Sequence, residues 1–186
     1  LTSSLSKERK AYEFFKLIKG KHASDVLILM KNKKILRFLL PGMEKIKKSN
    51  FEIITFDMPA HGQSVGNKTN IVELVACIKE IHVKYGPFTH AIAHSMGSMA
   101  LLRALRDGIP MKSVAIIGSG DKIRNVFCRF SEQLQFSDKV TEQMIQTVEK
   151  QFGMNLESYS SRMSLEHLKM PLLIVHDKDD KETPFV

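Results

Sequence analysis

The chain has 186 residues, of which 43% are hydrophobic and 26% are charged, the composition of an ordinary globular protein with a core of its own. No apolar run approaches the ~20 residues that cross a bilayer, which excludes a membrane-spanning segment. The N-terminal residues lack the order of a signal peptide, and the two cysteines show neither disulfide nor metal spacing. We therefore expect one cytoplasmic domain over residues 1–186.

The basic side chains outnumber the acidic ones, 28 to 20, which gives a formal net charge of +8. A basic surface attracts nucleic acid and anionic membranes. The lysines, however, fall in short groups at Lys31–Lys34 and Lys45–Lys48, without interleaved aromatic side chains. Such groups are typical of a solvated turn and of the polar face of a helix, so we expect no nucleic-acid partner.

Short β-branched runs alternate with longer helical patterns from residue 26 onward, which predicts an α/β fold with a mainly parallel sheet and helices on both faces. The N-terminal segment, centred on Ala11–Phe15, is expected to form a helix at the rim. The predicted strands are Val26–Met30 with Ile35-Leu36, Glu52–Phe56, His90–Ala93, Ser113–Ile117 and Leu172–Val175. The predicted helices are Phe38–Lys48, Ile71–Tyr85, Ser98–Asp107 and several within residues 122–168.

Polar motifs follow four of the predicted strands. They are Asp-Met-Pro-Ala-His-Gly-Gln-Ser at 57–64, Ala-His-Ser-Met-Gly at 93–97, Gly-Ser-Gly-Asp at 118–121 and His-Asp-Lys-Asp-Asp at 176–180. Because right-handed connections bring the carboxyl ends of parallel strands to one edge of the sheet, all four motifs are expected at the edge where open α/β sheets bind ligands.

The segment Ala93–Gly97 is the most informative of these motifs, since it is a variant of G-x-S-x-G with Ala93 in the first glycine position. The chain must turn abruptly from a strand into a helix at Ser95, and only small residues fit two positions away on either side. The pattern predicts that Ser95 is a nucleophile at a helix N-terminus. There the backbone N–H groups, that of Met96 among them, favour developing negative charge.

Taken together, these motifs resemble the α/β-hydrolase superfamily over most of the chain after the first predicted strand. The loop Asp57–Ser64 resembles the D-x-x-G-H-G-x-S loop of these hydrolases, with Ala60 in a glycine position. The segment Leu172–Pro184 is similar to their late strand ending in H-G-x-x-D-x-x-V-P, with Asp177 in place of the glycine and Thr183 in place of the valine. The resemblance implies an α/β-hydrolase fold.

The resemblance also implies site residues and an activity. Ser95 would be the nucleophile, the backbone N–H of Met96 one oxyanion donor, and Asp180 the acid that orients a catalytic histidine. The acid remains open to three rivals, Asp121, Asp177 and Asp179. The implied reaction is cleavage of a small-molecule carboxylic ester or thioester through an acyl-serine intermediate, with no metal or organic cofactor.

Residues 122–168 lie where this superfamily inserts a small helical cap before the late strand. Their apolar side chains would form the underside of the cap, which suits an acyl chain or a small hydrophobic ester. The same side chains would equally serve only to attach the cap to the core. They are Phe127, Phe130, Leu134, Phe136, Met144, Ile145, Val148, Phe152 and Met154.

Two parts of the superfamily pattern are missing from residues 1–186. The catalytic histidine is expected some tens of residues after the acid, whereas Val186 is only six positions beyond Asp180. We therefore expect this histidine outside residues 1–186, in a chain that is incomplete at its C-terminus. In these hydrolases the second oxyanion donor comes from a loop that opens with His-Gly directly after the early strand. No His-Gly pair follows the first predicted strand here, so we hypothesise that residues are missing between Leu36 and Arg37. The alternative is a non-catalytic α/β-hydrolase-like protein that binds a ligand or partner.

Overall fold

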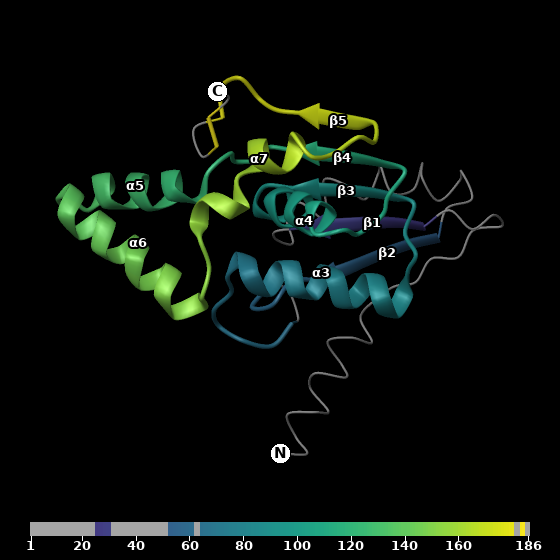
Figure 1. Cartoon of the computed structure of the whole chain (residues 1–186), viewed down its shortest axis with the longest axis horizontal. Coiled ribbons are helices and arrows are strands. Elements are labelled where there is room, and N and C mark those ends of the chain that lie inside the picture. Colours follow the sequence, from purple (N-terminus) through teal and green to yellow (C-terminus); the bar gives the residue numbers. More distant parts are fainter. Residues whose placement is uncertain (1–24, 31–51, 62–63, 181–182, 185–186) are drawn as a thin grey trace, which may run out of the picture.

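The computed structural model describes residues 25–30, 52–61, 64–180 and 183–184, and Figure 1 shows how its elements are arranged. The strands are β1 (Asp25–Met30), β2 (Glu52–Asp57), β3 (His90–His94), β4 (Ser113–Ile117) and β5 (Leu172–Val175). They pair in parallel in the order β2-β1-β3-β4-β5. The predicted parallel α/β sheet is confirmed, and each of these strands agrees with its prediction to within one residue at either end.

The helical elements of the described chain follow the predicted order. They are α3 (Ile71–Tyr85), α4 (Met96–Arg106), α5 (Ile123–Gln133), α6 (Asp138–Phe152), the 3-10 helix η1 (Leu156–Tyr159) and α7 (Ser161–Leu165). The prediction for α3 is confirmed at both ends, whereas α4 begins two residues earlier than predicted. The predicted elements at the N-terminus, at residues 35–36 and at residues 38–48 lie outside the described residues. Within the described part, no helix is long and apolar enough to span a membrane.

Helices α3, α4 and α7 pack side by side on one face of the sheet (Figure 1). The connections from β2 to β3 and from β3 to β4 step across the sheet in the same direction, and right-handed connections place such helices on the same face. Helices on the opposite face, which the fold class predicts, are not among the described elements, and the predicted helix at residues 38–48 lies outside the described residues. Helices α5 and α6 lie beyond the carboxyl ends of β3, β4 and β5 (Figure 1).

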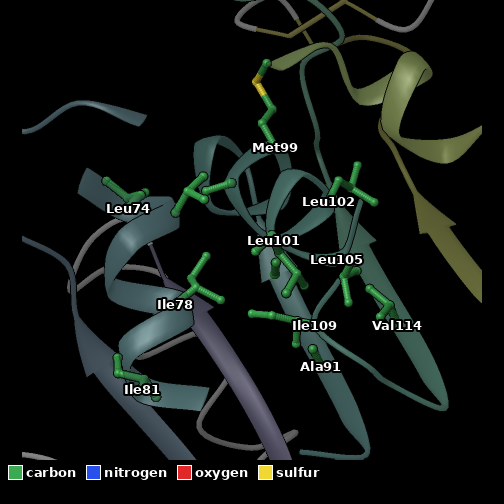
Figure 2. Close-up of a cluster of buried hydrophobic side chains, with 14 of the residues drawn as sticks. Leu74, Ile78, Ile81, Ala91, Met99, Leu101, Leu102, Leu105, Ile109 and Val114 are labelled. Carbon is green, nitrogen blue, oxygen red and sulfur yellow. The ribbon is translucent and has the colours of Figure 1, made fainter. Parts of the chain in front are cut away.

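The interface between α3 and α4 forms the centre of the core. The buried residues of α3 recur every three or four positions, as in an amphipathic helix: Ile71, Leu74, Val75, Ile78 and Ile81. The side chain of Asn70 caps this helix by accepting a 2.9 Å hydrogen bond from the backbone N–H of Glu73. Figure 2 shows Leu74 and Ile78 facing Leu101 of α4, which has no exposed surface.

Replacing Leu101 with alanine is expected to lower the free energy of unfolding by about 2–5 kcal/mol, because the deletion leaves a cavity in a closely packed site. Val83 is the matched control, since it lies on the outer face of α3 with 86% of its surface exposed. Val83→Ala should change the free energy of unfolding by less than about 0.5 kcal/mol. Urea denaturation measures both values, and equal losses would contradict the assignment of this interface as the core.

Asp107 follows α4 and joins it to α3 through two ion pairs. Its carboxylate lies 2.6 Å from Nζ of Lys79 and 2.8 Å from Nε of Arg103. Partial burial by itself raises the pKa of Asp107, but the hydrogen bonds and positive charges of Lys79 and Arg103 outweigh it and hold this pKa below its ordinary value. Arg103 also lies over the ring of Tyr159, 4.6 Å from its centroid, which links η1 to the same network.

This lowered pKa predicts a pH dependence of stability. The Asp107 carboxylate stabilises the fold at pH values above its unfolded-chain pKa of about 3.9. The stabilisation is lost as the pH falls through the lower pKa of the folded state. We therefore expect the free energy of unfolding to decrease more steeply below about pH 4 in the wild type than in Asp107→Asn.

Urea denaturation between pH 2 and pH 6 measures this difference, with Asp179→Asn as the control because Asp179 is exposed and follows β5. The control should keep the steep dependence of the wild type. The same slope in the wild type and in Asp107→Asn would contradict the predicted role of the ion pairs.

Candidate active site

Ser95 stands at the turn from β3 into α4. Its backbone has a φ of 54° and a ψ of −129°, a conformation that residues with a side chain rarely adopt. The neighbouring strand holds this turn, because the N–H of Ser95 donates a 2.9 Å hydrogen bond to the carbonyl of Ile117 at the end of β4. Ala93 and Gly97 are both buried. The strained turn between small residues that the spacing predicts is therefore present.

Met96 is the first residue of α4, directly after Ser95. The first N–H groups of a helix have no acceptor within the helix, and the helix dipole gives this end a partial positive charge. The N–H of Ser98 is already used, since it donates a 2.9 Å hydrogen bond to the carbonyl of Ser95. Negative charge that develops beside Ser95 would therefore meet the positive end of α4.

The Asp180 carboxylate is held in place by Thr183 in the loop after β5. The backbone N–H of Thr183 donates to Oδ1 of Asp180 over 2.9 Å, and its hydroxyl donates to Oδ2 over 2.7 Å. The ring Nε2 of His176 lies 3.9 Å from Oδ2 and 2.5 Å from the carbonyl oxygen of Thr183. These contacts fix the orientation of the carboxylate on both of its oxygens.

Gly118 brings the Asp180 loop close to the turn that holds Ser95. Its φ of +53° lies in the left-handed region, and its N–H donates to the carbonyl of Val175 over 2.9 Å. A Cβ atom placed on Gly118 would lie 3.5 Å from Nε2 of His94 and 3.7 Å from Oδ2 of Asp180. His94, the residue before Ser95, and Asp180 in the loop after β5 therefore lie against the same glycine.

Ser95 opens into a cavity of about 730 Å³. Only 8% of its surface is exposed, so the cavity is its route to a ligand. The walls are mainly apolar and come from α3, α4, α5, α6, η1 and the segment between α6 and η1: Ile71, Met96, Met99, Ile123, Val126, Phe127, Val148, Phe152, Met154 and Leu156. A volume of this size suits a small organic ligand.

Solved structures with the same architecture were found by comparison. Alpha/beta hydrolase domain-containing protein 10 from mouse is similar with a TM-score of 0.62 and 15% identity, over 91% of this chain and 74% of that one. An esterase from Pyrococcus furiosus is similar with a TM-score of 0.60 and 15% identity, over 99% and 76%. A bromoperoxidase from Bacillus anthracis is similar with a TM-score of 0.59 and 14% identity, over 90% and 78%.

This chain has the α/β-hydrolase fold. The predicted fold class is confirmed. Two of these proteins, the esterase and the bromoperoxidase, carry names of different activities. The α/β-hydrolase fold alone therefore does not determine the function, which depends on the residues of the site.

The N-terminal segment matches a different family in the sequence comparisons. Residues 1–47 match the family described as "Probable RNA and SrmB-binding site of polymerase A". The match covers about a quarter of the chain, and most of it lies outside the described residues. No curated protein matches the sequence.

The three rival acids have other contacts in this α/β-hydrolase fold. Asp121 accepts hydrogen bonds from the hydroxyl of Ser160 over 2.9 Å and from the backbone N–H of Arg162 over 3.1 Å, which anchors the start of α7. Asp177 accepts from the backbone N–H of Asp179 over 3.0 Å, and both residues are exposed. Asp180 is the acid of these four that packs beside Gly118, which favours it for the role.

The loop after β2 has the internal bonding of a structural turn. Ala60, in the glycine position of the superfamily pattern, has a φ of 59°. The hydroxyl of Ser64 donates to the carbonyl of Asp57 over 2.6 Å, and Nδ1 of His61 lies 2.9 Å from the carbonyl of Pro59. The resemblance in this loop therefore extends to a backbone conformation that glycine normally provides.

The described histidines do not line the cavity. Nδ1 of His90 lies 2.8 Å from the hydroxyl of Ser113, and Nδ1 of His167 lies 2.8 Å from the carbonyl of Met163. The ring of His82 meets Phe88 edge-on, and burial lowers the pKa of this histidine. The catalytic histidine outside residues 1–186 stays a prediction, as does the break between Leu36 and Arg37, which falls outside the described residues.

Two residues of the site were not singled out by sequence reasoning. Gly118 carried no signal beyond its place after a strand. Thr183 drew notice only as a departure from the valine of the superfamily pattern, yet its hydroxyl and its N–H both bond to Asp180. Threonine and valine have the same shape, so a pattern of residue sizes does not reveal this hydrogen bond.

Proposed function

We propose that the protein is a serine hydrolase that cleaves a carboxylic ester or thioester through an acyl-serine intermediate. The observation that carries the proposal is Ser95, held in a strained turn at the start of α4 and open to an apolar cavity. Strain of this kind costs on the order of 1–3 kcal/mol and persists where it serves a site. A helix cap alone does not require it.

The proposed reaction has two steps that share the same groups. The Ser95 hydroxyl attacks the carbonyl carbon while a histidine outside residues 1–186 takes its proton, and Asp180 orients that histidine. The Met96 N–H stabilises the oxyanion, and collapse of the tetrahedral intermediate passes the proton to the leaving alcohol or thiol. Water then attacks the acyl group by the same route, which releases the carboxylic acid and restores Ser95.

Helices α5 and α6 supply the proposed cap, within the predicted insertion at residues 122–168. Val126 and Phe127 of α5 and Val148 and Phe152 of α6 line the cavity. Ile145 is buried, and the Arg124 guanidinium pairs with the Glu142 carboxylate between the two helices. Of the apolar side chains predicted for the cap, Phe127, Val148, Phe152 and Met154 line the cavity, which supports a hydrophobic acyl group as the ligand. Phe130, Leu134 and Phe136 are instead exposed.

Trapping of the acyl-enzyme tests the proposed function. The protein is mixed with p-nitrophenyl butyrate and quenched in acid within milliseconds, and its intact mass is measured. We expect a burst of p-nitrophenol and a mass increase of one butyryl group, located on Ser95 by peptide mapping. Release of p-nitrophenol without a butyryl group on Ser95 would contradict the proposal.

A non-catalytic ligand-binding protein is a second candidate, favoured because no described histidine lines the cavity. The same experiment separates the two functions. A binding protein would bind a non-hydrolysable analogue such as butyl methyl ketone but would form no acyl adduct. Calorimetric binding together with an unchanged mass would favour this candidate.

RNA binding by residues 1–47 is a third candidate, favoured by the family match and by the distribution of charge. This segment carries 12 basic and 4 acidic side chains, so it accounts for the whole net charge of +8. Affinity for a single-stranded RNA oligonucleotide should then fall steeply with salt concentration. Substitution of Lys33 and Lys34 by glutamine should weaken binding, whereas the same change at Lys169 and Lys178 should not. Binding that is absent or insensitive to salt would contradict this candidate.

A further inference from the structure

Arg129 differs from the other described arginines in its contacts. Arg103 pairs with Asp107, Arg124 with Glu142 and Arg162 with Glu166, and Arg106 donates to the carbonyl of Ser158. Among the residues that the structure describes, no carboxylate lies within ion-pair distance of the Arg129 guanidinium, and no acceptor is assigned to it. Each of the other described arginines therefore has a carboxylate or a carbonyl partner within the described part of the protein, whereas Arg129 has neither there.

Arg129 lies on the cavity side of α5 and is half-buried. Asn125, one helical turn earlier, also lines the cavity. Most of the remaining wall is apolar. A guanidinium presents five N–H donors in a planar fork, and partial removal from water is unfavourable unless an acceptor replaces the lost hydration. The donors of Arg129 are therefore available to a molecule inside the cavity.

The other charged residues around the cavity are differently placed. Asp121 is bonded to Ser160 and to the backbone of Arg162. Lys122 lies 3.8 Å from the carboxylate of Glu157. Glu132, one turn after Arg129, also lines the cavity, but its carboxylate forms no ion pair within the described residues. Within the described part of the chain, Arg129 is thus the cavity cation with the clearest unmet requirement for an anion.

We propose that Arg129 binds an anionic group of the substrate, a carboxylate or a phosphate, and thereby determines specificity. This inference rests on the proposed function, since it takes the cavity beside Ser95 as the substrate site. A guanidinium matches both kinds of anion with two parallel hydrogen bonds. The substrate class is then an ester or thioester with an apolar segment and a negative charge away from the scissile carbonyl.

Arg129 lies away from the first turn of α5. Arg129 is six residues beyond the first residue of α5, which is about 9 Å along the helix axis. Ser95 lies at the sheet edge from which α5 extends. We expect an apolar segment between the anionic group and the scissile carbonyl, because the cavity wall is mainly apolar.

Calorimetric binding tests the inference without requiring turnover. The Ser95→Ala protein is titrated with monomethyl suberate, which carries one carboxylate, with hexyl phosphate, and with the neutral dimethyl suberate. The same titrations are repeated after adding Arg129→Gln, Arg129→Lys or the control Arg162→Gln, an exposed arginine of α7. Circular dichroism establishes that each variant is folded.

We expect at least one anionic probe to bind more tightly than dimethyl suberate and to lose about 10- to 100-fold in affinity in Arg129→Gln. Arg129→Lys should lose less, because it keeps the charge but not the planar fork, and Arg162→Gln should bind as the parent does. The preferred anionic probe identifies the carboxylate or the phosphate as the ligand group.

Two results would overturn the inference: neither anion binds more tightly than the neutral diester, or Arg129→Gln weakens all three ligands equally. The proposed function is judged separately, by acylation of Ser95 in the protein that retains this serine. Acylation without Arg129-dependent anion binding would leave the proposed function intact and reject the role of Arg129.

Discussion

Ester hydrolysis is expected to fall by on the order of 10³-fold or more when Ser95 is replaced by alanine, because the acyl-serine intermediate can no longer form. The remaining rate would come from binding and from the helix N-terminus alone. Initial rates with p-nitrophenyl butyrate, at substrate concentrations that separate kcat from KM, measure the effect. The loss should appear in kcat, since the Ser95 hydroxyl takes part in the reaction itself.

Ser98 provides the matched control for this substitution. It lies one helical turn along α4, is fully buried, and its hydroxyl makes only a 3.4 Å contact with the carbonyl of Ile117. Ser98→Ala removes a hydroxyl from the same helix but should leave kcat within about a factor of three, because a long, weak hydrogen bond contributes little. Comparable losses in both alanine variants would indicate damage to the turn from β3 into α4 rather than loss of a nucleophile.

The backbone strain at Ser95 also predicts a difference in stability between two variants of this residue. Glycine adopts positive φ values at no steric cost, whereas serine at a φ of 54° is strained. Ser95→Gly is therefore expected to unfold at higher urea concentration than Ser95→Ala, by about 1 kcal/mol in the free energy of unfolding. Equal stability of the two variants would contradict the assignment of strain to this residue.

Asp180→Asn is expected to lower kcat by up to about 10⁴-fold, because the amide holds the catalytic histidine in the wrong tautomer and does not stabilise its charged form. The substitution keeps the shape of the side chain. The asparagine keeps one side-chain oxygen, which can still accept a hydrogen bond from the N–H or the hydroxyl of Thr183. The expected effect is therefore on the reaction rate and not on folding.

The three rival acids serve as controls for Asp180. Asp177→Asn and Asp179→Asn alter exposed carboxylates of the same loop and should leave kcat nearly unchanged. Asp121→Asn should mainly affect stability, because this carboxylate anchors Ser160 and the backbone of Arg162. A large loss of kcat in Asp121→Asn, with none in Asp180→Asn, would transfer the role of the acid to the loop after β4.

The fold was predictable where local periodicity and burial agree. The helix over Ile71–Tyr85 combines an Asn cap, a regular apolar face and a terminating Gly-Pro, so both of its ends were predicted. The start of α4 was predicted two residues late. The helix begins at Met96, directly after the turn at Ser95, but the apolar periodicity by which its start was predicted becomes regular only further along the chain.

The site was predictable where its chemistry needs a local spacing and not where it depends on contacts between distant segments. The small residues around Ser95 are adjacent in the chain, so the strained turn could be predicted. The choice of Asp180 over Asp121 depends on packing against Gly118, which lies more than 60 residues away in the sequence. The lack of a described anionic partner for Arg129 likewise depends on contacts between side chains, which the sequence does not contain.

Reaction of Ser95 with a fluorophosphonate is the most direct test of this account, because the reagent modifies serines that are activated as nucleophiles. The purified protein is incubated with the reagent, and the modified residue is identified by peptide mapping. We expect a single adduct on Ser95 that disappears in Asp180→Asn and persists in Ser98→Ala. An unmodified Ser95, or an adduct that forms equally well in Asp180→Asn, would contradict the assignment of Ser95 and Asp180 to one catalytic site.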